Sequence, residues 1–369
     1  MNEIIVHIPA QAASGYPIVI GTGILSRLLA RIERLFPKKP LFIVTDEKLV
    51  QAGHLATLTA GKNMPTYIIT PAGEQSKTMA TATAILETME QHRLSRDTVV
   101  IGLGGGTVGD IAGFAAAVFK RGVPVIHIPT TTVAQADSSV GGKTGVDSSL
   151  SKNAFGCFWY PSAVFIDTAT LKTLDDLQYR AGLVESVKHA AIADAEYFVF
   201  LEKNTDAILR RDTIILEKIA GWNCRIKASV VEEDPTEKNK RRILNYGHTI
   251  GHAVESACNY QLLHGQCVAI GIIAAGMMEQ SLGMVNDDRL ERIEAILKKL
   301  GMPTGISAGV KMEQLMDLLS LDKKAVGKRP WFVLLEKLGR VYCKDGWWAH
   351  EVSQDIVKEC LGRLAEKTP

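Results

Sequence analysis

Residues able to do chemistry are concentrated in four short segments of this chain. They are 137–145 (DSSVGGKTG), 182–190 (GLVESVKHA), 245–255 (NYGHTIGHAVE) and 263–266 (LHGQ). Their carboxylates and imidazoles are the side chains that bind divalent metals, and their lysines attract anions. This combination predicts a metal centre ringed by cations, which suits an anionic, oxygen-rich substrate. We therefore expect an enzyme.

The segment 245–255 has helical spacing. His248 and His252 are four residues apart and Glu255 follows three later, so on a helix all three share one face. Two imidazoles at this spacing can bind zinc. Taken alone, a histidine of this kind is more often a hydrogen-bonded helix residue near a core than a metal ligand. The alternative role for Glu255 is a solvated carboxylate, or one that supports a metal ligand.

A second candidate ligand lies in the segment 182–190. Glu185 can share a helix face with Lys188 or with His189, and the alternative role for it is a salt bridge to either. A catalytic zinc usually has three protein ligands and a position open to substrate. Spacing alone permits several sets, and Glu185 with His248 and His264 is one of them.

Cationic side chains near these segments can hold an anion. Lys143 follows two glycines in what we expect to be a flexible turn, and Asp137 could orient it or contact a hydroxyl. Lys227 and Arg241 are, taken singly, more typical of surface charges. Their closeness to the histidine segment is the reason to consider them, together with Asn245, Lys152 and Asn153.

Residues 104–109 match G-x-G-x-x-G after an apolar strand. Glycines there let backbone amides approach a pyrophosphate at the positive end of a helix beginning near Thr107. The acid usually found about 20 residues later is missing, because Asp110 comes too soon and Asp46 precedes the loop. We expect a nucleotide site in which the acidic residue and the glycine loop follow one another in a non-standard order. The alternative is a tight turn without a ligand.

The elements that must position these residues fall into two groups. Six β-branched runs alternate with helical stretches up to about residue 178, at 17–21, 41–46, 66–70, 97–104, 124–129 and 163–167. Such runs predict a parallel sheet covered on both faces. Later segments have helical periodicity, at 181–204, 264–284 and 287–302, before a β-rich stretch at 331–342.

The predicted fold is therefore α/β with two domains. Residues 1–178 should form a Rossmann-like nucleotide-binding domain, and residues 179–369 a mainly helical domain that binds metal and substrate. The connection lies near 168–176, where we expect a ligand cleft.

Composition excludes several other classes of protein. The 369 residues include 42 basic and 40 acidic side chains, interleaved for a net charge of +2, so no strongly basic nucleic-acid face is indicated. Six scattered cysteines without a C-x-x-C pair predict reduced thiols. The first residues do not read as a secretory signal, and no run reaches the ~18 apolar residues of a membrane helix. We expect a cytoplasmic protein that acts on a small molecule.

Several motifs occur together in one order: GGGTVGD (104–110), KRG (120–122), IPTTTVAQADSSVGGKTGV (128–146), KN (152–153), GLVESVK (182–188), LNYGHTIGHA (244–253) and LHG (263–265). In these the chain resembles the 3-dehydroquinate synthase family, from about residue 40 to at least 335. The resemblance implies an NAD- and metal-dependent cyclase that converts 3-deoxy-arabino-heptulosonate 7-phosphate to 3-dehydroquinate and phosphate, a shikimate-pathway step. Transient oxidation, phosphate elimination, reduction and an intramolecular aldol closure would follow in turn.

The resemblance also implies roles for individual residues. Zinc or cobalt would be bound by Glu185, His248 and His264, with His252 handling protons beside the substrate. Substrate contacts would come from Asp137, Lys143, Asn153, Lys188, Lys227, Arg241 and Asn245. Arg121 would reach the phosphate in the adjacent subunit of a homodimer. A lysine of 323–328 would close over the phosphate. NAD would contact Asp46, Glu74, Lys77, Gly106, Thr107, Val108, Gly109, Asp110, Thr130, Thr131, Lys143, Lys152, Thr170, Leu171, Lys172 and Thr173.

The chain also departs from the family pattern. The loop 147–153 lacks the usual histidine and glycine, the segment 234–241 lacks a usual acid and glycine, Gln266 replaces a glutamate and Ser186 replaces an aliphatic residue. These departures leave open a cyclase for another sugar phosphate. A polyol dehydrogenase of the same fold is a further alternative, although its uncharged substrate would not require lysines at 143, 188 and 227. An inactive binding protein is the third.

Overall fold

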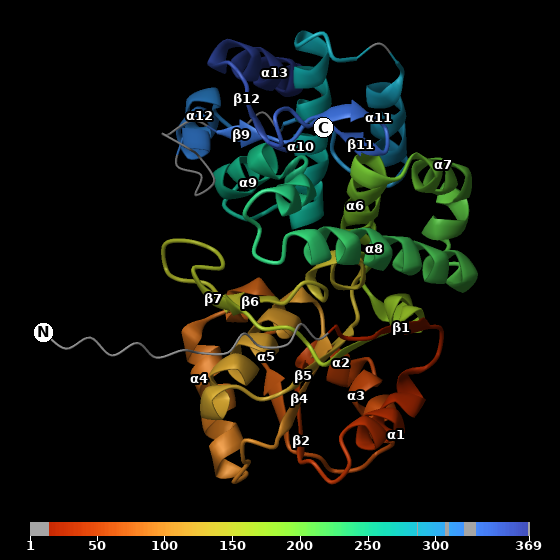
Figure 1. Ribbon diagram of the computed structural model, residues 1–369, viewed down its shortest axis with the longest axis vertical. Helices are drawn as coiled ribbons and strands as arrows, with labels where there is room; N and C mark the ends of the chain where they lie inside the picture. Colours follow the sequence, from red (N-terminus) through yellow and green to blue (C-terminus); the bar gives the residue numbers. More distant parts are fainter. Residues whose placement is uncertain (1–14, 286, 307–309, 321–329, 368–369) are drawn as a thin grey trace, which may run out of the picture.

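A computed structural model describes residues 15–285, 287–306, 310–320 and 330–367 of the protein. The N-terminal half is built on a six-stranded sheet in the order β1-β8-β5-β4-β2-β3, in which every neighbouring pair is parallel (Figure 1). The strands are β1 (Ile18–Gly21), β2 (Leu41–Asp46), β3 (Thr66–Ile69), β4 (Val99–Gly104), β5 (Val125–Pro129) and β8 (Ala163–Asp167). The predicted parallel sheet is confirmed.

Helices cover both faces of this sheet. Leu41 and Ile43 of β2 pack with α1 (Leu25–Leu35) and α3 (His54–Thr59), whereas Phe42 and Val44 pack with α4 (Met79–Gln91) and α5 (Gly106–Val118). Successive side chains of a strand point to opposite faces, so a strand buried on both sides must be apolar throughout. Short elements complete this half, namely α2 (Glu47–Gln51), η1 (Glu74–Ser76), η2 (Phe119–Arg121), η3 (Ala134–Ser138) and η4 (Thr168–Thr173).

The direction of the chain reverses between β2 and β4. From β2 the chain continues outward to β3, whereas from β4 it passes through α5 to β5 on the other side. Such a point in a parallel sheet opens a crevice at the carboxyl ends of the strands, where nucleotides bind. Asp46 ends β2 and Gly104 ends β4, so both lie at this point.

The sequence context predicts that Lys143 lies in a flexible turn, and this prediction is wrong. Lys143 is the first residue of β6 (Lys143–Val146), which pairs antiparallel with β7 (Phe155–Phe158). The turn consists of Gly141 and Gly142, whose φ angles of 96° and 69° suit glycine. The Lys143 backbone is therefore fixed, and its reach depends on its side chain.

The C-terminal half is mainly helical, as predicted. Its helices are α6 (Asp176–Ala193), α7 (Ala195–Leu209), α8 (Thr213–Glu233), α9 (His248–Ala257), α10 (His264–Ser281), α11 (Arg289–Lys299), α12 (Met312–Ser320) and α13 (Gln354–Glu366), with a 3-10 turn η5 (Lys240–Asn245). The short strands are β9 (Trp331–Phe332), β10 (Leu335–Lys337), β11 (Arg340–Val341) and β12 (His350–Glu351). None of the described helices has both the length and the apolar character needed to cross a bilayer.

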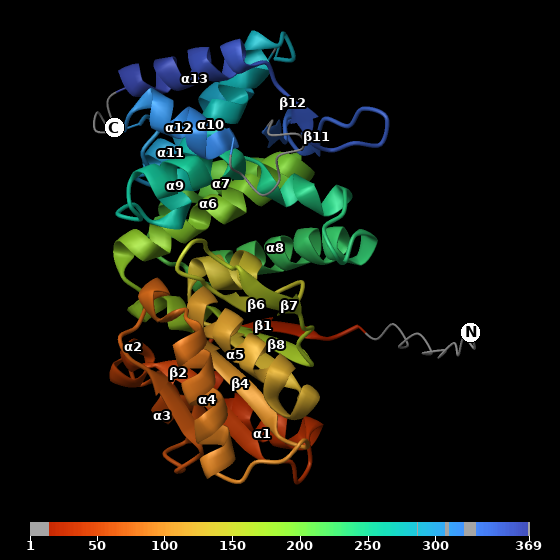
Figure 2. The same ribbon diagram turned by 90° about the vertical axis from the view of Figure 1, so that its left-hand side faces the viewer.

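The helical half rests on the sheet half through α8, which runs between the two tiers (Figures 1 and 2). Ala220 and Cys224 of α8 pack with Val164 and Ile166 of β8. The stretch 181–204, which reads as one helix, is divided at Asp194, whose carboxylate accepts a hydrogen bond from the Tyr197 amide and caps α7. The predicted boundary at residue 178 lies inside the first turn of α6, and the division into domains remains a prediction.

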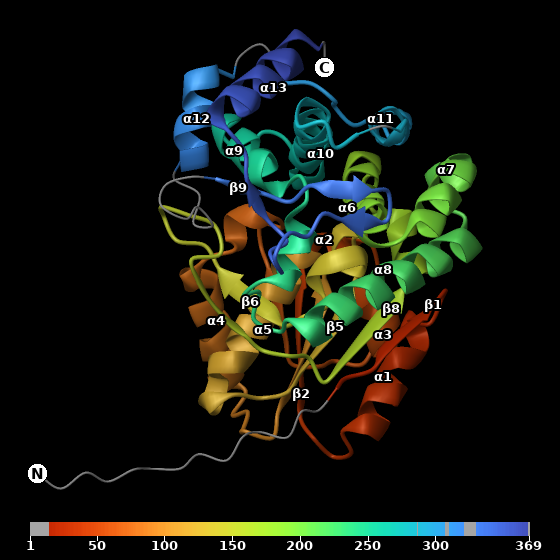
Figure 3. The ribbon, with the colours of Figure 1, turned by 45° about the horizontal axis from the view of Figure 1, so that its top comes forward.

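Helix α10 lies at the centre of the helical half, surrounded by α6, α9, α11 and α13 (Figure 3). Its contact with α9 is unusually close, because a Cβ atom on Gly271 would lie 1.8 Å from the Gly247 carbonyl oxygen. Gly251 of α9 likewise faces the Cys267 carbonyl oxygen, 3.0 Å from where its Cβ would be. Glycine therefore sets the distance between the two helices that carry the candidate histidines.

This packing predicts that Gly271→Ala separates α9 from α10. Overpacking of this kind should lower the free energy of unfolding by about 1–3 kcal/mol, measured by urea denaturation. The control is Gly362→Ala in α13, where an added Cβ meets nothing within 4 Å. That variant should be unchanged or slightly stabilised, since alanine is the better helix former. Equal effects of the two substitutions would contradict the close packing.

Candidate functional site

Two imidazoles and one carboxylate from distant parts of the chain converge beneath α6. The Oε1 atom of Glu185 lies 3.7 Å from Nε2 of His248 and 3.7 Å from Nε2 of His264. Ligands of a tetrahedral zinc, each about 2.0–2.2 Å from the ion, are roughly 3.4 Å apart. The three atoms are therefore close enough to share one cation.

The Glu185 carboxylate is buried, with 1% of the residue exposed. Within the described part of the chain neither of its oxygens has an aligned hydrogen-bond donor, and its ion pair is with Lys188 one helical turn later. A buried charge in this state is costly. A divalent cation would satisfy these oxygens, so the residues present fit a metal ion.

The backbone orients both histidine rings. His248 is the first residue of α9, after Gly247 with φ 76°, and its Nδ1 lies 3.1 Å from the Tyr246 carbonyl oxygen. His264 is the first residue of α10, and its Nδ1 lies 3.6 Å from Oε2 of Glu255. Partners at Nδ1 turn Nε2 of each ring toward Glu185, as is usual for metal-binding histidines.

The partner carboxylate also sets the electrostatics of this corner. Burial alone would raise the pKa of Glu255, but His264 and Lys152 outweigh it and hold that pKa at about 2. Burial would lower the pKa of His264, yet the carboxylates of Glu255 and Glu185 raise it above its ordinary value. Glu255 is therefore a buried anion rather than a solvated one.

Other ligand sets remain geometrically possible. The rings of His248, His252 and His264 offer nitrogens within 4.8 Å of one another, and so do ligand atoms of Asp137, Glu185 and His189. The second group already has two positive partners, because Lys227 lies 2.8 Å from Asp137 and Lys188 pairs with Glu185. The two remaining ligand sets share His248 and His264 and differ in the third ligand, which is Glu185 in one and His252 in the other.

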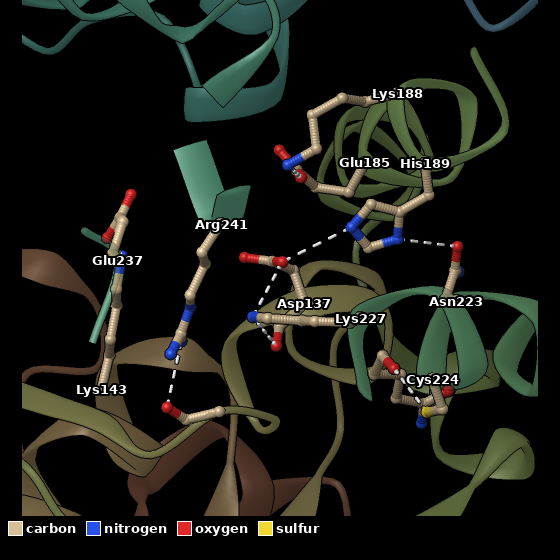
Figure 4. A network of polar contacts seen from close by, with 12 residues as sticks. Asp137, Lys143, Glu185, Lys188, His189, Asn223, Cys224, Lys227, Glu237 and Arg241 are labelled. Atoms are coloured by element: carbon tan, nitrogen blue, oxygen red, sulfur yellow. Dashed lines mark hydrogen bonds and ion pairs between the residues drawn. The ribbon is translucent and has the colours of Figure 1, made fainter. Parts of the chain in front are cut away.

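Three of the expected anion-binding side chains, Lys143, Lys227 and Arg241, lie below Glu185 in Figure 4. Lys227 and Arg241 are buried, so the expectation of surface charges from each residue alone is wrong. The Arg241 guanidinium donates to the carbonyl oxygens of Gly141 and Pro235, and its Nε has no partner among the described residues. A buried N–H left in this way can donate a hydrogen bond to a substrate oxygen.

Further charged pairs join the two halves of the molecule. Lys143 of β6 pairs with Glu237, which also accepts a hydrogen bond of 2.8 Å from the Asn245 amide. Lys152 contacts Glu255 of α9 at 2.9 Å. Glu237 was not singled out from the sequence; the only signal was an acid between two predicted site segments. Glu237 pairs with Lys143 and Asn245, two side chains that could instead bind an anionic ligand.

The beginning of α5 fits a dinucleotide phosphate. Its cap residue, Gly105, has no side chain to satisfy the first amides, and no acid lies in the first turn. Such amides, at the positive helix end, bind phosphate. A Cβ on Gly105 would lie 2.9 Å from Thr131, so the backbone there is packed too closely for a larger residue. The residues present therefore fit the nucleotide.

The other predicted cofactor residues line the same edge of the sheet. Lys77 lies 2.6 Å from Asp110 and 2.5 Å from the Asn153 side-chain oxygen. Thr107 donates to Glu74 at 2.8 Å. Asp46 caps α2 after β2, Thr130 and Thr131 follow β5, and Thr170, Leu171, Lys172 and Thr173 belong to η4 after β8. All of these follow the carboxyl ends of parallel strands.

One predicted residue in the described part of the chain is not brought to this edge. Arg121 is exposed at the far end of α5, which spans about 20 Å, so it does not join the site within one chain. The lysine expected at 323–328 lies outside the described residues.

Asp234 holds the loop that delivers Arg241 and Asn245. Its carboxylate accepts hydrogen bonds from the amides of Lys238, Asn239 and Arg241 at 2.9, 2.7 and 3.0 Å. Burial acts to raise the pKa of Asp234, but these amides lower it below the ordinary value. The ionised form is therefore the one that holds the loop.

We predict that Asp234→Asn lowers the free energy of unfolding by about 1–3 kcal/mol at pH 7. Because the folded-state pKa is depressed, this stabilisation is present above the unfolded-state pKa and is lost as pH falls through the folded-state pKa. Wild type and variant should therefore converge in acid, as measured by denaturation at several pH values. Asp97→Asn is the control, since that exposed carboxylate has its partner Lys39 at 3.5 Å. Parallel pH curves for wild type and Asp234→Asn would contradict the assignment.

Two family models match the chain. The one described as 3-dehydroquinate synthase N-terminal matches residues 67–181, and the one described as 3-dehydroquinate synthase C-terminal matches residues 182–325. A 3-dehydroquinate synthase from Desulforamulus reducens is 42% identical over 330 residues, which cover 88% of this chain and 92% of that protein.

Solved structures with the same architecture include two cyclases. A 2-deoxy-scyllo-inosose synthase, complexed with carbaglucose-6-phosphate, NAD+ and Co2+, is 27% identical with a TM-score of 0.82, covering 93% of this chain and 95% of that one. A 2-epi-5-epi-valiolone synthase from Streptomyces hygroscopicus, with NAD+ and Zn2+ bound, is 25% identical with a TM-score of 0.86, covering 98% and 99%.

Proposed function

The chain belongs to the 3-dehydroquinate synthase family, and we propose that it converts 3-deoxy-arabino-heptulosonate 7-phosphate to 3-dehydroquinate and phosphate. It would act as a carbon–oxygen lyase that uses NAD and a divalent metal, zinc or cobalt. The observation that carries the proposal is the meeting of Glu185, His248 and His264 with buried cations. A phosphorylated sugar acid offers vicinal oxygens to a metal ion held by these three residues. Its phosphate and carboxylate are anionic groups that the buried cations can bind.

We assign the metal to Glu185, His248 and His264, and NAD to the carboxyl edge of the sheet around α5. When bound, NAD would accept a hydride from the substrate carbon that bears a hydroxyl and later return it, and a metal ion would polarise the substrate oxygens. The uncapped amides of α5 would hold the pyrophosphate. His252, whose ring centroid is 5.4 Å from that of His248, would handle protons beside the substrate.

The cations would bind and orient the substrate. Lys143 is half exposed and can leave Glu237 for a phosphate or carboxylate oxygen, whereas Lys188, Lys227 and Arg241 are fixed in the interior. Asp137, Asn153 and Asn245 add groups that bind hydroxyls. Fixed charges cost little reorganisation when negative charge develops on the leaving phosphate. Arg121 would complete the phosphate site of a neighbouring subunit, which implies a homodimer.

A cyclase for another sugar phosphate is the second candidate. The observation that favours it is the loop 147–153, where Ser148 and Ser151 close a turn by hydrogen bonds at 3.0 and 3.3 Å. Asp147 accepts from the Asn153 amide at 2.6 Å, which holds Asn153 close to Lys77. Identification of the product distinguishes this candidate from the first.

The proposed reaction predicts phosphate and 3-dehydroquinate in equal amounts when the protein is given the heptulosonate phosphate, NAD and zinc or cobalt. NADH absorbance should show no net change, because the hydride returns to the same molecule. A chelator should abolish turnover and added metal restore it. Accumulation of NADH would indicate a dehydrogenase, and release of phosphate with another carbocycle would indicate the second candidate.

The ligand assignment predicts different losses for two variants. Glu185→Gln should weaken zinc binding by more than about 100-fold, beyond the loss typical of residues outside the coordination sphere. His252→Asn should keep its zinc and lose turnover by about 10²- to 10⁴-fold. Metal content by atomic spectroscopy and turnover are measured for both. The opposite pattern, with zinc lost from His252→Asn and kept by Glu185→Gln, would assign the three histidines instead.

A further inference from the structure

A chain of buried polar side chains leads from the interior of the helical half to Asp137 (Figure 4). Its members are Ser186 and His189 of α6, Tyr197 of α7 and Asn223 of α8, each at most 2% exposed. None of them is among the metal ligands or substrate contacts assigned under the proposed function. Buried polar groups are expensive unless they are satisfied, so this arrangement requires an account.

The Asn223 amide is fixed from three directions. Its Nδ2 donates to the Ser186 hydroxyl at 2.9 Å, and its Oδ1 accepts from the Tyr197 hydroxyl at 3.0 Å. Nδ1 of His189 lies 3.1 Å from the same Oδ1. Tyr197 is held in turn by stacking on Trp222, with ring centroids 5.0 Å apart. The imidazole of His189 therefore has one allowed orientation.

That orientation points the ring toward the site. Nε2 of His189 lies 3.6 Å from Oδ1 of Asp137, and the same Oδ1 lies 2.8 Å from Nζ of Lys227. In the described ranges the buried Nε2 has no aligned hydrogen-bond partner. Oδ1 of Asn223 is an acceptor, so Nδ1 of His189 carries a proton toward it. A lone pair on Nε2 would face an oxygen lone pair of Asp137, whereas a second proton on Nε2 makes the ring an imidazolium that the carboxylate attracts. Burial would raise the pKa of Asp137, but Lys227, Lys188 and His189 hold it well below the ordinary value, so the carboxylate is the acceptor.

We infer that His189 is a positioning residue, which donates from Nε2 to Asp137 and holds that carboxylate, beside Lys227, in place for the substrate. Ser186, Asn223 and Tyr197 keep the ring in line. The inference rests on the proposed function, because Asp137 is assigned there to the substrate. It also gives Ser186 a physical role, because the Ser186 hydroxyl accepts a hydrogen bond from Asn223.

Two substitutions of His189 separate positioning from packing. His189→Gln can place an amide nitrogen near the position of Nε2 and keep a donor to Asp137. His189→Asn keeps a polar group near Asn223 and loses the donor to Asp137. We expect kcat to fall about 10- to 100-fold in the asparagine variant, as for a misplaced catalytic geometry, and less than about 5-fold in the glutamine variant. Zinc content should be unchanged in both.

If His189 has a merely structural role, the two variants should show the reverse order of kcat. The asparagine variant would then match or exceed the glutamine variant in kcat, and activity would follow the thermal midpoint. That outcome would overturn the inference. Recovery of activity by glutamine without recovery of the thermal midpoint would support it.

A measurement that does not depend on turnover tests the contact between His189 and Asp137 even if the proposed function is wrong. In protein labelled with ¹⁵N-histidine and loaded with zinc, the His189 signal is identified by its loss in His189→Gln. We expect a hydrogen on Nε2 whose signal shifts in Asp137→Asn. An unprotonated Nε2, or a signal unchanged in Asp137→Asn, would overturn the contact. If wild type lacks turnover while Nε2 is protonated toward Asp137, the proposed function fails and the positional contact stands.

Discussion

A buried carboxylate that lacks an aligned hydrogen-bond donor among the residues described is the constraint on which the site depends. Glu185 lies in the middle of α6, closed off from water, and its oxygens face Nε2 of two histidines. Removing a charge from water in this way is unfavourable unless a positive group compensates for it. Lys188 supplies one positive charge, and histidines that bind a metal ion offer it lone pairs rather than charge. A divalent cation is the group that reconciles an anion with two neutral imidazoles.

The backbone must bring three helices together for this to happen. His248 and His264 begin α9 and α10, and these helices approach so closely that only glycine fits at Gly271. The partners at Nδ1, the Tyr246 carbonyl and Glu255, then turn both rings in one direction. Packing and polar contacts thus act on the same two side chains.

Charge balance connects this corner to the sheet half. Lys152 reaches Glu255, Lys227 reaches Asp137, and Lys143 reaches Glu237 across the junction. Each cation has a carboxylate partner in the molecule without substrate, so the charges are compensated. An anionic substrate would exchange with these carboxylates, and no new charge would need to be buried. The same contacts join the two halves, which links binding of an anion to their relative position.

Much of the fold could be predicted from the sequence, because strands buried on both faces form continuous apolar runs, as LFIV of β2 and VVIGLG of β4 do. The break at Asp194 was missed because the helical periodicity continues through it. The β6–β7 hairpin was missed because strands of four residues that contain glycine, one of them exposed throughout, carry a weak signal. Spacing identified which residues share a helix face, but it could not choose between Glu185 and His252, since that depends on how α6 meets α9. The burial of Lys227 and Arg241 and the contact of His189 with Asn223 depend likewise on tertiary packing.

Anomalous diffraction from crystals grown with zinc tests the central claim most directly. The account predicts one strong peak at the zinc absorption edge, bonded to Oε1 of Glu185 and to Nε2 of His248 and His264, with His252 outside the coordination sphere. A peak coordinated by His252 in place of Glu185, or the absence of any peak between these residues, would contradict it.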